Sequence, residues 1–127
     1  MAGYRTPLAR VRGLGSAREG TEHFLRQRLT AIANLFLVSF AILIVVRLAG
    51  ADYLTVKRTL AEPQNTIALL LLILSGAVHM RLGMQSIIED YVHTEAYKVL
   101  ALLGNTFFAA AVGLTSAYAV LKLSFGA

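Results

Sequence analysis

Residues 66–88 read TIALLLLILSGAVHMRLGMQSII, and this stretch decides the fold. It carries no charge up to Val78, and only then come the polar side chains of His79, Arg81 and Gln85. An α-helix needs about 20 predominantly apolar residues to cross a bilayer. Lipid offers no hydrogen-bond partners to the backbone, so a segment of this kind must be helical. The stretch therefore predicts a transmembrane helix.

Two further apolar segments lie on either side of it, at residues 29–48 and 99–121, and we expect short connections at 49–65 and 89–98. The chain has 127 residues, of which 57% are hydrophobic and 15% are charged. Soluble domains are typically about 45–50% apolar and about 25% charged. We therefore predict an all-α membrane protein with three transmembrane helices, divided into a basic segment (1–28) and a three-helix anchor (29–127). This length leaves no room for a large catalytic domain, and the absence of cysteine excludes disulfides and cysteine-ligated iron–sulfur clusters.

Basic residues are unequally distributed between the two sides of the predicted anchor. With three spans, residues 1–28 and the connection 89–98 share one side and together hold seven Lys or Arg, whereas the other side holds four. The larger group consists of Arg5, Arg10, Arg12, Arg18, Arg26, Arg28 and Lys98. Basic residues favour the cytoplasmic side of a membrane. We expect a cytoplasmic N-terminus, and we assign the formal charge of +5 to membrane orientation rather than to nucleic-acid binding.

An ionisable side chain within a span is costly, and it indicates function by default. On a helix, His79, Gly83, Ser86 and Asp90 lie on one face, because they are spaced by four, three and four residues. Such small residues let another helix, or a flat macrocycle such as haem, approach the backbone closely. The residues alone leave two interpretations open: His79 bonds to a neighbouring helix, which the pattern slightly favours, or it ligates a haem iron.

The other two histidines are poor partners for a metal shared with His79. His23 lies in the basic segment and His93 in the polar connection, both near the expected membrane surface. If His79 ligates a six-coordinate haem, the second axial ligand must come from another chain. The chain would then be a subunit of a complex.

Asp90 and Tyr91 follow at the cytoplasmic end of the same span. A phenol can donate a hydrogen bond to a quinone carbonyl, and a carboxylate can orient it or relay protons. Tyrosine is also common at membrane interfaces, and the spacing alone favours that simpler role. Arg28, directly before the first span, has a similar pair of roles: interfacial anchoring, or contact with the propionates of a haem.

Residues 79–91, HMRLGMQSIIEDY, resemble the second span of the hydrophobic membrane anchor of succinate dehydrogenase, a cytochrome b-type anchor. His79, Gly83, Asp90 and Tyr91 meet the pattern of that family. Residues 20–31, GTEHFLRQRLTA, are similar to its lead into the first span, where an Arg-x-Thr-Ala ending recurs. The resemblance covers nearly the whole chain in the number, order and length of its segments.

The resemblance implies a non-catalytic subunit that forms half of a two-subunit, haem-binding helical bundle. Its partners would be a second membrane anchor (the cytochrome b subunit), an iron–sulfur subunit and a flavoprotein subunit. His79 matches the axial ligand of haem b, Tyr91 the residue that hydrogen-bonds ubiquinone, Asp90 its acidic neighbour, and Arg28 a residue near the haem propionates. We expect the bacterial form, in the inner membrane, since no presequence is evident.

Two alternatives remain open from the sequence. The first is the anchor of a related fumarate reductase, which runs the same couple in reverse with a low-potential quinone. The second is a structural or pore-forming protein with three spans and no cofactor. A b-type haem spectrum that depends on His79 separates this second alternative from the other two.

Overall fold

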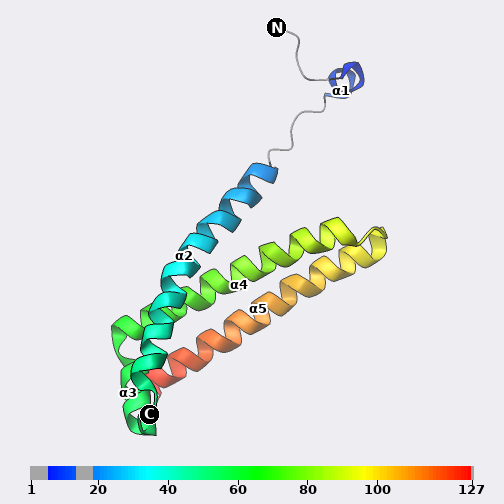
Figure 1. Cartoon of the computed structure of the whole chain (residues 1–127). Helices are drawn as coiled ribbons and strands as arrows, with labels where there is room; N and C mark the ends of the chain where they lie inside the picture. Colours follow the sequence, from blue (N-terminus) through cyan, green and yellow to red (C-terminus); the bar gives the residue numbers. More distant parts are fainter. Residues whose placement is uncertain (1–5, 14–18, 127) are drawn as a thin grey trace.

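The computed structural model describes residues 6–13 and 19–126, which contain five helices and no strand (Figure 1). The helices are α1 (Pro7–Val11), α2 (Glu19–Leu48), α3 (Tyr53–Ala61), α4 (Pro63–Tyr91) and α5 (Glu95–Phe125). Within α2, α4 and α5, three segments are long and apolar enough to cross a membrane: Gly20–Leu48, Pro63–Tyr91 and Glu95–Phe125. The predicted all-α architecture with three membrane-spanning helices is confirmed.

All three long helices extend beyond the predicted apolar segments. They contain 30, 29 and 31 residues. At about 1.5 Å per residue each is roughly 45 Å long, whereas the hydrocarbon core of a bilayer is about 30 Å thick. The extension is largest for α2, which begins at Glu19 instead of residue 29. The polar ends of these helices therefore reach the headgroup region or the water beyond it.

The helix α4 is the centre of the arrangement, because it packs against both α2 and α5. Figure 1 shows α4 and α5 running side by side as an antiparallel hairpin, while α2 crosses this hairpin at an angle. Among the described residues, the buried hydrophobic side chains are few: Ile44, Leu82, Ile88 and Ala109. Most apolar side chains of the three helices point outwards, as expected of helices that cross a membrane.

The helix α3 was not predicted, since residues 49–65 were assigned to a connection. Gly50 has φ +80°, a left-handed conformation that glycine adopts readily, and it ends α2. Pro63 occupies the first turn of α4, where its missing N–H costs nothing. The segment between Gly50 and Pro63 is long enough for a short helix of nine residues. We conclude that the turn residues at 50 and 63 were the signal for this helix.

The corner between α3 and α4 is held by polar side chains in the first turn of α4. Asn65 Nδ2 donates to the carbonyl oxygen of Thr59 at 2.7 Å, and Thr66 Oγ1 donates to that of Leu60 at 3.0 Å. These two carbonyl groups lie at the end of α3, where helical partners are missing. Thr66 Oγ1 also lies 3.2 Å from Ser124 Oγ on α5, from which it can accept a hydrogen bond. Asn65 and Thr66 are buried, so these bonds offset the cost of removing their polar groups from water.

Candidate functional site

His79 lies on the side of α4 that faces α2, and it bonds to that helix. Its Nδ1 lies 3.1 Å from Thr30 Oγ1, and the imidazole is half-buried. One helical turn earlier on α4, Ser75 Oγ donates to the backbone carbonyl of the same Thr30 at 3.4 Å. Residues four apart on a helix lie on one face, which is why both can meet one residue of α2. The predicted bond between His79 and a neighbouring helix is therefore present within this chain.

Small and polar residues line both sides of this contact, which we call the polar seam. On α2, the residues that share the face of Thr30 are spaced by four, three and four positions. A Cβ atom added at Gly83 of α4 would lie 3.3 Å from Gln27 Nε2 of α2, so the glycine allows a close approach of the two helices. The polar seam consists of His23, Gln27, Thr30 and Asn34 on α2, and of Ser75, His79, Gly83 and Ser86 on α4.

The second ring nitrogen of His79 has no hydrogen-bond partner among the described residues. Nε2 makes no hydrogen bond within residues 6–13 and 19–126, and it is absent from the buried polar atoms that lack a partner, so it reaches the surface of the chain. In proteins, a metal-ligating histidine almost always bonds through its other ring nitrogen to a nearby group. His79 thus fits an axial haem ligand at an interface. The described residues contain no group of three or more His, Asp or Glu side chains suited to a metal, so His79 would be a single ligand.

Unlike His79 Nε2, three atoms of the polar seam are buried without a hydrogen-bond partner in the described part of the chain. They are His23 Nε2, Gln27 Oε1 and Asn34 Oδ1. An unpaired buried polar group costs about 1–3 kcal/mol. The sequence analysis assigned no role to these residues, although their spacing on α2 is visible in the sequence. The polar seam therefore contains hydrogen-bonding capacity that this chain does not use.

Asp90 and Tyr91 lie side by side in the last turn of α4, as predicted. The Tyr91 side chain is 79% exposed, and neither of the two side chains makes a hydrogen bond within the described residues. The ring nitrogen Nδ1 of His93 lies 3.0 Å from the backbone oxygen of Tyr91. Along the helix, Tyr91 is about 18 Å from His79 at about 1.5 Å per residue. The candidate metal ligand, His79, thus lies within the span, whereas the candidate hydrogen-bond donor, Tyr91, lies at its end.

Arg28 is not brought to His79. It is exposed, and its guanidinium carbon lies 4.7 Å from the centre of the Phe24 ring, one turn earlier on α2. It lies two positions before Thr30 on the helix, so the two side chains leave α2 in different directions. The neighbouring Arg26 forms an ion pair with Glu22 on the exposed surface. On this chain, Arg28 is available to a group bound outside α2.

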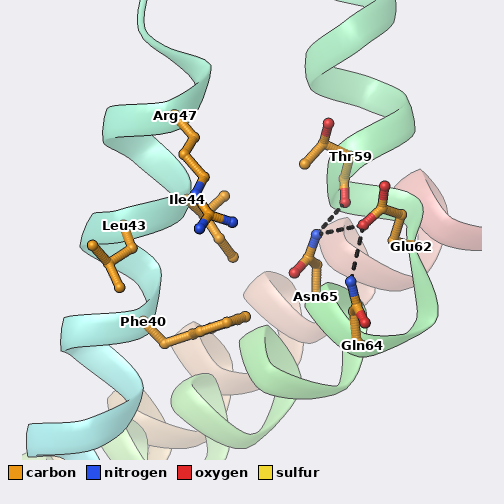
Figure 2. Close-up of a pocket in the computed structure, with 8 residues that line it drawn as sticks. All are labelled: Phe40, Leu43, Ile44, Arg47, Thr59, Glu62, Gln64 and Asn65. Carbon is orange, nitrogen blue, oxygen red and sulfur yellow. Dashed lines mark hydrogen bonds between the residues drawn. The ribbon is translucent and has the colours of Figure 1, made fainter.

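A cavity of about 430 Å³ lies at the opposite end of α4, between α2 and the corner of α3 and α4 (Figure 2). Phe40, Leu43, Ile44 and Arg47 form its α2 side. Figure 2 shows Glu62 on the other side, accepting hydrogen bonds from Gln64 and Asn65. The sequence analysis did not find this cavity, because half of its lining comes from the segment that was assigned to a connection. None of the predicted site residues lines it.

Comparison with known proteins gives one family. Residues 2–114 match the family described as "Succinate dehydrogenase/Fumarate reductase transmembrane subunit". The chain is 29% identical over 124 residues to a succinate dehydrogenase hydrophobic membrane anchor subunit of Paracoccus denitrificans, which covers 98% of the chain and 95% of the relative. It is 32% identical over 89 residues to the subunit of the same name from Rickettsia bellii, which covers 70% of the chain and 71% of the relative. No solved structure matches the chain at a significant level.

Proposed function

Because the chain belongs to the family of succinate dehydrogenase and fumarate reductase transmembrane subunits, we propose that it anchors a bacterial succinate:ubiquinone oxidoreductase (respiratory complex II). It performs no succinate chemistry itself. A flavoprotein subunit and an iron–sulfur subunit bind on its cytoplasmic side, and a second anchor packs beside it in the inner membrane. The outward-facing apolar side chains of the three long helices provide surface for that second anchor and for lipid.

One observation supports the proposed haem site: the two ring nitrogens of His79 have different surroundings. Nδ1 is engaged by Thr30, while Nε2 reaches the surface of the chain. His79 is then one axial ligand of haem b, and the second comes from the partner anchor. Arg28 is close enough to the start of the span to contact a propionate. When bound, the haem supplies a group that holds and releases one electron within the membrane.

Tyr91 and Asp90 form this chain's part of the proposed ubiquinone reduction site. The Tyr91 hydroxyl is exposed on the isolated chain and has no partner among the described residues, so it can donate a hydrogen bond to a quinone carbonyl. Negative charge develops on that oxygen during reduction, and a donor aimed at it stabilises the transition state. Asp90, the preceding residue, can orient the phenol or pass a proton to the reduced quinone.

The proposed haem ligand is tested by the dithionite-reduced spectrum of the complex purified from membranes. We expect a b-type band in the native complex and its loss in His79→Ala. The variant His93→Ala is the matched control, because this histidine lies in the connection between α4 and α5, and it should retain the band. An unchanged haem content in His79→Ala would exclude the ligand role. The absence of haem from the native complex would favour a cofactor-free structural protein.

The proposed orientation places the basic segment 1–28 in the cytoplasm and the C-terminus in the periplasm. Its support is the asymmetry of basic residues, of which Arg5 and Arg18 lie outside the described residues. A periplasm-active reporter fused after Ala127 should be active, and a cytoplasm-active one should be silent. The reverse pattern would overturn the orientation and would put Tyr91 on the wrong side for an iron–sulfur partner.

The family description also names fumarate reductases, so an anchor of that enzyme is the second candidate. The two differ in the direction of electron flow, which depends on the reduction potential of the quinone. Purified complex should reduce a high-potential ubiquinone with succinate faster than it oxidises a low-potential quinol with fumarate. The opposite preference would support the second candidate.

A further inference from the structure

The Thr30 hydroxyl lies within hydrogen-bond distance of His79 and of its own helix, and these contacts bear on which nitrogen of His79 carries the proton. Its oxygen lies 2.9 Å from the backbone oxygen of Arg26 and 3.1 Å from that of Gln27, both in the preceding turn of α2. The same oxygen lies 3.1 Å from His79 Nδ1. A hydroxyl has one proton to donate and two lone pairs with which it accepts. Carbonyl groups cannot donate, so when the Thr30 proton points to either of them, the hydroxyl oxygen accepts from His79 Nδ1.

A neutral imidazole carries its proton on one nitrogen and a lone pair on the other. If Nδ1 donates to Thr30, then the lone pair is on Nε2, the nitrogen that reaches the surface of the chain. We propose that Thr30 is a positioning residue that holds His79 in the tautomer and ring orientation needed to ligate a haem iron. This inference rests on the haem site proposed above and assigns a role to a residue that the sequence analysis left without one.

Ser75 strengthens this arrangement from the same face of α4. Its hydroxyl donates to the Thr30 backbone oxygen at 3.4 Å. Thr30 is thus held by two residues of α4 that are one turn apart, which fixes the register of α2 against α4 at the level of the imidazole. A shift of either helix would break the bonds to Ser75 and His79 together.

The bond between Nδ1 and Thr30 also affects the iron. A hydrogen bond that accepts the Nδ1 proton makes the imidazole a stronger donor through Nε2. A stronger donor stabilises the ferric state more than the ferrous state, and this lowers the reduction potential of the haem. Removing the acceptor should therefore raise the midpoint potential and weaken haem binding.

The test compares Thr30→Val, Thr30→Ser and Thr115→Val in the complex purified from membranes. Valine keeps the shape of threonine and removes the acceptor, whereas serine retains it. Thr115 is an exposed residue of α5, so Thr115→Val makes the same chemical change away from the haem ligand. The measurements are haem per complex, the midpoint potential from a redox titration, and the low-spin EPR signal of the ferric haem.

In Thr30→Val we expect about 10- to 100-fold weaker haem binding, as is typical when a partner of a metal ligand is removed. The haem that remains should show a raised potential and an altered EPR signal. Thr30→Ser and Thr115→Val should match the native complex. If Thr30→Val assembles poorly, the EPR signal and the midpoint potential of the assembled fraction still test whether Thr30 positions His79.

Wild-type haem content, potential and EPR signal in Thr30→Val would overturn the positioning role, and so would a Thr30→Ser variant that behaves like Thr30→Val. These results leave the haem ligand itself intact as long as His79→Ala loses the haem. If His79→Ala retains the haem, the proposed function fails first, so the two failures are distinguishable.

Discussion

The two faces of α4 use different chemistry to hold their neighbours. Towards α5, the contact is made of small residues and satisfied bonds: a Cβ atom added at Gly113 would lie 3.3 Å from Ala77 Cβ, and buried Asn105 donates to the Arg81 backbone oxygen at 2.9 Å. Towards α2, the contact is the polar seam, where His79 and Ser75 bond to Thr30. The face of α4 towards α5 serves helix packing. The face towards α2 also carries His79 Nε2, which has no hydrogen-bond partner among the described residues.

The difference extends to the polar groups that lack partners. The three buried atoms without a partner, on His23, Gln27 and Asn34, belong to α2, and their spacing places them on the face of Thr30. On the other face, Arg81 lies at the surface and its Nε donates to Thr106 Oγ1 at 3.3 Å. Buried polar groups in native proteins are nearly always paired. We infer that the polar groups between α4 and α5 are satisfied within the described chain, whereas part of those in the polar seam are not.

The largest expected effect comes from filling the polar seam with a larger side chain. Gly83→Leu would push against Gln27 of α2, because even a Cβ atom there lies 3.3 Å from the amide nitrogen. Overpacking of this kind costs about 1–3 kcal/mol, and here it should also displace the helix that positions His79. We expect less assembled complex and loss or alteration of the haem spectrum.

Gly113→Leu makes the same change on the other face of α4, where the added side chain meets Ala77. It should reduce assembly while leaving the haem spectrum of the assembled fraction unchanged. Gly104→Leu is the control for both, since nothing lies within 4 Å of an added Cβ atom there among the described residues. Equal damage to the haem spectrum by the substitutions at Gly83 and Gly113 would remove the distinction between the two faces.

The second effect concerns the end of α4. Tyr91→Phe removes a hydroxyl that has no partner in the described chain, so the stability of the anchor and the proposed haem site should hardly change. If the hydroxyl donates to the quinone, its loss should cost about 1–3 kcal/mol, which corresponds to an approximately 5- to 150-fold fall in succinate:ubiquinone reductase turnover.

Tyr97→Phe is the matched control for this substitution, because Tyr97 is similarly exposed in the first turns of α5. It should retain full turnover, and both variants should reduce an artificial dye that accepts electrons before the quinone. Native turnover and native inhibitor sensitivity in Tyr91→Phe would return Tyr91 to the role of an interfacial anchor.

The sequence predicted the three membrane helices because membrane spans are specified by length and hydropathy alone. It also placed Asp90 and Tyr91 at a helix end and His79, Gly83 and Ser86 on one face, since helical periodicity needs no tertiary information. It missed α3, whose nine residues mix polar and apolar side chains without a long apolar run. The bounding turn residues Gly50 and Pro63 were the available signal.

The contact between His79 and Thr30 could not be read from the sequence, because it joins residues 49 positions apart. Periodicity indicates which residues share a face of one helix, but not which helix packs there or in which register. Thr30 was visible only as part of an Arg-x-Thr-Ala ending, and a threonine in a helix usually bonds to its own preceding turn. The polar positions of α2 at 23, 27, 30 and 34 contained the signal for a polar face, which the high arginine content of the lead obscured.

A smaller effect is expected from a pair of identical substitutions. Asn105→Leu removes the bond to the Arg81 backbone oxygen, and hydrogen bonds between membrane helices average about 0.6 kcal/mol, with a maximum of about 1.7 kcal/mol. Asn34→Leu removes an amide whose oxygen is buried and unpartnered within the described residues. It should therefore cost less than Asn105→Leu when thermal unfolding is measured on the isolated anchor in detergent. An equal or larger cost for Asn34→Leu would show that its amide is satisfied in the folded anchor.

The smallest effect tests another bond between a threonine and a titratable side chain, outside the predicted membrane spans. At the start of α3, the Thr55 hydroxyl donates to the carboxylate of Asp52, the residue that precedes this helix. The Thr55 hydroxyl and, to a lesser extent, backbone N–H groups hold the pKa of Asp52 below its ordinary value of 3.8. Asp52 is fully exposed, so water screens and replaces this bond. Removing the bond from Thr55 should shift the pKa of Asp52 without changing the fold.

A lowered carboxyl pKa means that the folded state binds the proton less tightly than the unfolded state. The bond therefore stabilises α3 at neutral pH, and this stability is lost as the pH falls below the ordinary pKa and through the lowered one. Thr55→Val should raise the pKa of Asp52 towards its ordinary value, while Thr55→Ser should not. An NMR titration of the Asp52 carboxyl carbon measures this directly. The small stability difference between the native protein and Thr55→Val should be present at pH 7 and vanish in acid, whereas a difference that persists in acid would show that the hydroxyl acts through packing instead.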